Sequence, residues 1–122
     1  MEDLKLISIL KSLTKKEFRE FGRFVYSPFF NRLNNIIKFY EELKEYYPGF
    51  SNKEFTAENI YARIFPDEKF SYSKMKLLES DMLKLAEEYL AFIGYKENSY
   101  EKDKFLLSEL KKRKLIKMFE IN

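Results

Sequence analysis

The 122-residue sequence contains neither cysteine nor histidine. Without cysteine the chain has no disulfide and no thiolate nucleophile, and without histidine it lacks the usual general base and the commonest metal ligand. Tryptophan is also absent, and there are only three glycines and three prolines. So few turn-forming residues favour a small number of long elements over many short strands.

Long hydrophobic runs are absent as well. No apolar segment approaches the length needed to cross a bilayer, and the run Leu6–Leu10 is too short for a signal sequence. We therefore expect a cytoplasmic protein that does not associate with membranes.

Aromatic residues are abundant, with thirteen Phe and nine Tyr making up 18% of the chain, and apolar residues reach 45%. That composition is typical of a globular protein, and the length predicts one domain over residues 1–122. The predicted fold class is all-α: an irregular or orthogonal bundle of six or seven helices around a long central helix, about 72–93.

The central helix is predicted from its boundaries and its apolar pattern. Ser71 can cap its start, Gly94 suits its end, and no Pro or Gly lies between them. Two apolar rows follow helical spacing: Met75, Leu78, Met82, Leu85, Tyr89 and Phe92, then Leu83, Ala86, Leu90 and Ile93. So broad an apolar face predicts a core helix rather than a surface helix.

The other helices are predicted from caps and breakers. The first covers 2–13, and a capping box at Thr14–Glu17 starts the second, which ends before Pro28. The second is predicted to pack through a stripe of residues at helical spacing, Phe18, Phe21, Phe24 and Val25. The third extends from Asn31 to Tyr47, and the fourth, capped by Thr56 or Ser51, ends at Pro66. A last helix begins near Ser99, with a break at 113–114 and a further helix from 115 whose apolar pattern is still unfinished at Asn122.

The residues available for catalysis form no recognisable active site. Neighbouring acids, Glu41 with Glu42 and Glu87 with Glu88, point in different directions on a helix and cannot share a substrate atom. No glycine-rich loop is present to bind a phosphate, and no spacing resembles a metal site. We predict a non-enzymatic protein with no catalytic residues, cofactor, metal or small-molecule substrate.

Two candidate sites remain. The apolar corner Phe29–Phe30 and the apolar end of the chain predict contacts with a protein partner; the residues are Phe29, Phe30, Met118 and Phe119. A basic run near the C-terminus is a candidate anion or nucleic-acid patch, although its charges spread around a helix; it comprises Lys111, Lys112, Arg113, Lys114 and Lys117.

The chain resembles a group of uncharacterised bacterial all-helical proteins with a Ser/Thr-Lys-x-Glu-Phe run followed by Ser-Pro-Phe-Phe-Asn. The matching segments here are Thr14–Phe18, Ser27–Asn31, Ile64–Pro66 and Ser73–Leu90. The resemblance implies an N-terminal helical module, continued in longer chains by helical pairs like Leu106–Phe119, although Lys114 stands where a turn glycine is expected. It therefore also implies that 99–122 is the start of a truncated helical-repeat extension. It implies no activity.

The function we expect is a protein–protein interaction or scaffolding module that binds a protein partner or a second copy of itself. The alternative is a nucleic-acid-binding helix-turn-helix in the 57–82 region, with Lys74 and Lys76 near the recognition end and the 111–117 patch in support. The acidic residues Glu79 and Asp81 follow at once, which favours the first hypothesis.

Overall fold

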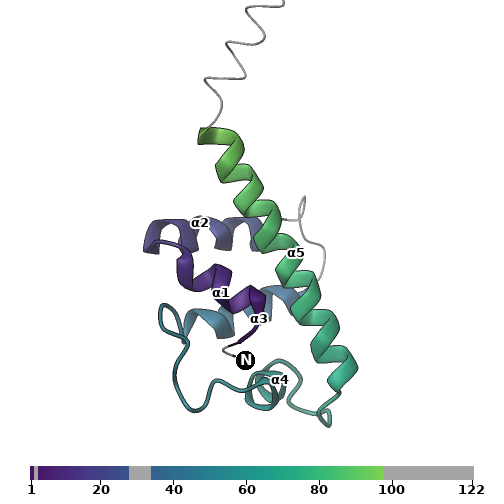
Figure 1. Ribbon diagram of the computed structural model, residues 1–122. Coiled ribbons are helices and arrows are strands. Elements are labelled where there is room, and N and C mark those ends of the chain that lie inside the picture. The colour runs from purple at the N-terminus through teal and green to yellow at the C-terminus, as the bar shows by residue number, and fades with distance from the viewer. Residues whose placement is uncertain (2, 28–33, 98–122) are drawn as a thin grey trace, which may run out of the picture. The chain divides into compact units, whose positions relative to one another are not determined.

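The computed structural model describes residues 1, 3–27 and 34–97 (Figure 1). It contains five helices: α1 (Lys5–Ser12), α2 (Lys15–Tyr26), α3 (Asn34–Lys44), α4 (Ala57–Ile64) and α5 (Tyr72–Glu97). The described residues form no strand, so the all-helical class is confirmed. None of the described helices combines the length and the apolar character needed to span a membrane.

The chain divides into two compact units, Met1–Tyr89 and Leu90–Asn122. The first unit contains α1–α4 and α5 as far as Tyr89. In this unit α1–α4 lie on one side of α5 (Figure 1). The second unit is described only over the last turns of α5.

Three predicted caps are present. The Thr14 hydroxyl accepts a hydrogen bond from the Glu17 backbone N–H at 3.1 Å, and the Glu17 carboxylate accepts one from the Thr14 N–H at 2.8 Å. This reciprocal pair is a complete capping box. Thr56, rather than Ser51, caps α4, and Ser71 caps α5 through the Lys74 N–H.

The core of the first unit is built largely from aromatic and branched side chains, as predicted. On α2 the whole predicted stripe is buried: Phe18, Phe21, Phe24 and Val25. Two aromatic residues that we did not assign to the core from the sequence are also buried, Phe39 on α3 and Phe50 in the loop after it. Phe39 lies on the buried side of α3 with Ile36, Tyr40 and Leu43, and Phe50 packs against the ring of Phe55.

The predicted central position of the long helix is wrong in one respect. The first apolar row of α5 is buried from Met75 to Tyr89, but Leu77 and Leu90 are exposed. The helix therefore buries one side rather than its whole circumference, because the other helices of this unit all lie on that side (Figure 1).

The predicted boundaries also need correction. α5 continues through Gly94 to Glu97, and the structure describes no glycine with a positive φ. A helical glycine costs only about 1 kcal/mol relative to alanine, which the flanking turns can absorb. The first helix is shorter than the predicted 2–13. The predicted count of six or seven helices is not matched, since the described residues form five, and the helices predicted after residue 98 lie outside them.

Candidate functional site

None of the site residues predicted from the sequence can be placed. These residues lie outside the described part of the chain: Phe29, Phe30, Lys111, Lys112, Arg113, Lys114, Lys117, Met118 and Phe119. The described residues instead reveal a different candidate site, on α2 and α3.

The region predicted as a helix-turn-helix is described. Seven residues, 65–71, separate α4 from α5, whereas the DNA-binding motif uses a turn of three or four. Lys74 lies 2.9 Å from a carboxylate oxygen of Glu68, and the hydrogen bond that the lysine donates to this carboxylate raises the lysine pKa. Lys76 lies 3.4 Å from the Glu79 carboxylate, which raises its pKa by charge attraction. Both lysines are thus already paired with acids of this chain.

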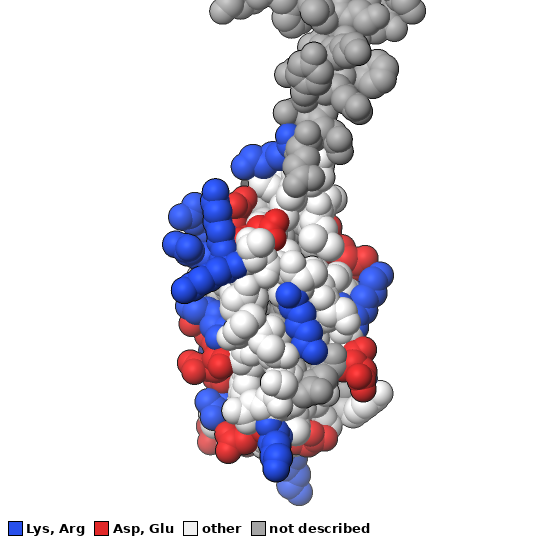
Figure 2. Space-filling model, turned by 60° about the vertical axis from the view of Figure 1, so that its left-hand side comes forward, with Lys and Arg blue, Asp and Glu red and all other residues white. Residues whose placement is uncertain are grey.

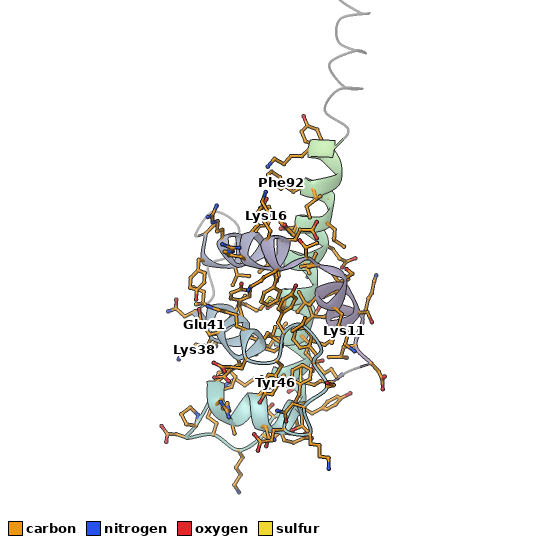
Figure 3. The ribbon with its side chains drawn as sticks, turned by 90° about the vertical axis from the view of Figure 1, so that its left-hand side faces the viewer. Lys11, Lys16, Lys38, Glu41, Tyr46 and Phe92 are labelled. Carbon is orange, nitrogen blue, oxygen red and sulfur yellow. The ribbon has the colours of Figure 1, made fainter. Side chains whose placement is uncertain are left out.

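A groove of about 340 Å³ opens between α2 and α3. We call it the α2–α3 groove; the residues that line it are Lys15, Phe18, Arg19, Tyr26, Tyr40, Lys44 and Tyr47. Figure 3 shows α2, with Lys16 labelled, above α3, with Lys38 and Glu41 labelled. The lining of the α2–α3 groove combines aromatic rings with three cationic side chains and contains no described acidic residue.

A close approach between Gly22 and Tyr40 shapes the floor of the groove. A methyl carbon built on Gly22 would lie 2.6 Å from Cζ of Tyr40, and closer still to the hydroxyl oxygen. Glycine therefore lets Tyr40 reach across to α2, where its hydroxyl donates a hydrogen bond to the Phe18 carbonyl at 3.0 Å. Burial raises the pKa of the Tyr40 hydroxyl, which keeps it protonated as this donor.

The aromatic side chains that line the groove contact one another. Phe18 stacks on Tyr47 with centroids 4.1 Å apart and on Tyr40 at 5.3 Å. The Tyr47 hydroxyl donates to the Leu13 carbonyl at 2.7 Å, which ties this wall to the end of α1. Tyr26 meets Tyr40 edge to face and remains 46% exposed at the rim. The aromatic surface is consequently preorganised.

Positive charge borders the aromatic surface. Lys15 and Arg19 project from α2, and Lys44 from α3, where it lies 3.5 Å from Glu41 and over the ring of Tyr40. Arg19 also lines a neighbouring hollow of about 220 Å³ on α2, together with Lys16, Arg23 and Glu20. Figure 2 shows lysine and arginine side chains gathered over α2, on the left of the surface.

The cations of α2 form no ion pair in the part of the chain that the structure describes, although Glu20 lines the same hollow as three of them. The ion pairs of that part join other residues: Lys5 with Glu87, Lys44 with Glu41, Arg63 with Glu42, Lys74 with Glu68 and Lys76 with Glu79. We call Lys15, Lys16, Arg19 and Arg23 the α2 basic face. These four side chains remain available to an external anion.

The sequence contained a signal for this face that our search for functional residues missed. Lys15, Arg19 and Arg23 follow one another at steps of four, opposite the phenylalanine stripe of the same helix. The groove itself had no such signal. Tyr40 and Tyr47 fit the core face of their helix, and only the fold shows that they flank an opening.

The described residues that line the groove are aromatic or cationic. No group of three or more acidic side chains among the described residues is arranged to hold a metal ion. A scan against family models, and searches of curated proteins and of solved structures, found no match to this chain. Function is therefore argued from the groove and its charges.

Proposed function

We propose that this protein is a non-enzymatic interaction module that docks a partner protein in the α2–α3 groove. The observation that carries the proposal is the combination of an open aromatic groove with unneutralised cations beside it. Protein interfaces are enriched in aromatic residues and arginine, and concentrate binding energy in a few such anchors. Tyr26 and Arg19 are the anchors we expect here.

The rigidity of the groove supports this proposal. Its rings stack on one another, and the hydroxyls of Tyr40 and Tyr47 are fixed by backbone carbonyls. A partner that docks against fixed side chains loses less entropy than one that must order them. Among the described residues of the groove there is no nucleophile with an adjacent base, which suits binding better than catalysis.

The helix-turn-helix alternative draws less support. Lys74 and Lys76, near its recognition end, pair with Glu68 and Glu79, so a DNA phosphate would have to compete with both carboxylates. The longer connection between α4 and α5 also departs from that motif.

Site-specific photo-crosslinking tests the proposal. A photoreactive phenylalanine analogue replaces Tyr26 at the groove in one variant and Tyr72, which is 68% exposed at the start of α5, in the control. We expect a discrete protein adduct, either to another protein or to a second copy, from position 26 in living cells and none from position 72. The adduct should disappear when Arg19→Glu is added.

Two outcomes would contradict the proposal. Equal labelling from both positions would mean that the groove has no selectivity for protein. An adduct to nucleic acid at position 26 would favour the alternative function.

A further inference from the structure

We infer that the α2–α3 groove takes an acidic segment of its partner, with an apolar side chain on the aromatic surface and Asp or Glu carboxylates on the surrounding cations. This inference rests on the proposed function and specifies the partner's chemistry.

The cations in and beside the groove match the charge of an acidic segment. The groove lining contributes Lys15, Arg19 and Lys44, and the adjoining α2 basic face adds Lys16 and Arg23. Among the described residues that line the groove and the hollow, Glu20 is the only acid, while Glu41 pairs with Lys44 and the Glu17 carboxylate accepts the Thr14 N–H. Surfaces that bind each other are arranged with opposite potentials, so a segment carrying several carboxylates fits this surface.

Two arginines on α2 can each bind a carboxylate through a pair of hydrogen bonds. Arg19 lines both the groove and the hollow, and Arg23 lies one turn further along α2. A guanidinium donates two parallel hydrogen bonds to a carboxylate, which fixes the register of the segment as well as attracting it. A chain that continues from the groove toward Arg23 would place successive carboxylates along the helix.

The arrangement of the rings distinguishes a peptide from a nucleic acid. Single-stranded nucleic acids bind by stacking their bases on open aromatic faces. Here Phe18 already stacks on Tyr40 and Tyr47, and Lys44 lies 5.8 Å from the Tyr40 ring centroid. Faces used in this way are closed to a base, whereas an aliphatic or aromatic side chain of a peptide can pack against ring edges in the groove.

Fluorescence polarisation with the full chain and short synthetic probes of equal length tests the inference. The main probe is a labelled peptide of Asp and Glu around a central Leu-Phe pair. The comparison probes replace the acids with Gln, replace the acids with Lys, or replace Leu-Phe with Ser-Ser; a fourth probe is an oligouridine RNA. We expect the acidic Leu-Phe peptide to bind at least about tenfold more tightly than every other probe.

Variants connect the binding to the groove. Arg19→Gln should weaken binding of the acidic peptide about tenfold, whereas Lys84→Gln, which removes one charge from α5 outside the groove, should leave it unchanged. Added salt should weaken binding to the wild type more than to Arg19→Gln, because the salt screens an attraction that the variant partly lacks.

Each contrary result has a distinct meaning. Equal binding of the Gln peptide would overturn the acidic specificity and leave a protein-docking groove. Tighter binding of the RNA would overturn the inference together with the proposed function. Absence of binding by all probes would contradict the inference, while the crosslinking at position 26 would still decide whether the groove docks a protein.

Discussion

α2 and α5 both carry lysine or arginine on their exposed sides, but the cations near the start of α5 pair with acids whereas those of α2 pair with no described acid. On α5, Lys74 and Lys76 lie within 2.9 Å and 3.4 Å of carboxylates from this chain. On α2, no described acid pairs with Lys15, Lys16, Arg19 or Arg23. Paired charges stabilise their own surface weakly, whereas unpaired charges on a rigid helix are available to a partner.

The surroundings of the glycine in each helix also differ. α2 lies so close to Tyr40 that Gly22 has no room for a side chain, whereas nothing approaches the corresponding position at Gly94 of α5. A tightly packed support holds the α2 side chains in place. In the function that we propose, binding is concentrated on α2, whereas α5 as far as Tyr89 contributes buried side chains to the core.

The largest expected effect tests whether α5 buries only one side. Leu85 is 6% exposed and Leu77 is 63% exposed on the same helix. Leu85→Ala should lower the free energy of unfolding by about 2–5 kcal/mol, because it leaves a cavity in the core. Leu77→Ala should change it by less than about 0.5 kcal/mol. Urea denaturation measures both, and equal losses would mean that α5 is buried all round.

The two helical glycines provide the next test. An alanine normally stabilises a helix by up to about 1 kcal/mol relative to glycine, and Gly94→Ala should do so because its surroundings are open. Gly22→Ala should instead destabilise by about 1–3 kcal/mol, because its methyl group would displace the Tyr40 ring. Thermal unfolding of the two variants measures this difference. Stabilisation by both substitutions would show that α2 and α3 are not in tight contact.

The N-terminal caps allow a finer comparison. Thr14 and Glu17 exchange two hydrogen bonds at the start of α2, whereas the Ser71 side chain accepts one 3.3 Å bond from the α5 backbone. Thr14→Ala should cost about 1 kcal/mol of unfolding free energy, and Ser71→Ala should cost less. Chemical denaturation of the pair measures the difference. A greater loss for Ser71→Ala would contradict our expectation that the two hydrogen bonds of the Thr14–Glu17 capping box stabilise the start of α2 more than the Ser71 cap stabilises the start of α5.

Local patterns predicted the local structure well. The phenylalanine stripe of α2, the capping box and the first apolar row of α5 as far as Tyr89 depend on neighbours within one helix, and all three are confirmed. The burial of Phe50 could not be predicted in this way, because it depends on contacts between its ring and those of Tyr47 and Phe55 around a loop. The position of Leu77 likewise depends on which side of α5 the other helices cover.

The candidate site escaped prediction for the same reason. The spacing of Lys15, Arg19 and Arg23 is visible in the sequence, but a solvated helix face has the same spacing. Tyr40 is a clearer example. Its position in the apolar repeat of α3 predicts that its side chain is buried, and this is confirmed. The same repeat gives no information about the groove beside it. A groove arises where two helices meet, and their relative placement is a tertiary property.

The smallest effect that we predict concerns the contact between α2 and α5. Tyr89 of α5 packs its ring against Phe21 and Phe24 of α2, and its buried hydroxyl has no hydrogen-bond partner among the described residues. Tyr89→Phe removes that unsatisfied group and keeps the ring. We therefore expect the free energy of unfolding at neutral pH to stay constant or to rise by up to about 1 kcal/mol.

The pH dependence sharpens this test. Burial, followed by the charges of Glu20 and Glu17, raises the pKa of Tyr89 to about 12 from the model-compound value of 10.0. Since the folded state holds its proton more tightly, the stability of the wild type is fully present below pH 10 and falls as pH rises toward 12. Tyr89→Phe should flatten part of this decline, and the residual slope should include Tyr40, whose pKa is also raised by burial. Urea titrations at several alkaline pH values measure the slope. An unchanged slope, or a clear loss of stability at neutral pH, would mean that the Tyr89 hydroxyl has a partner at the junction of α2 and α5.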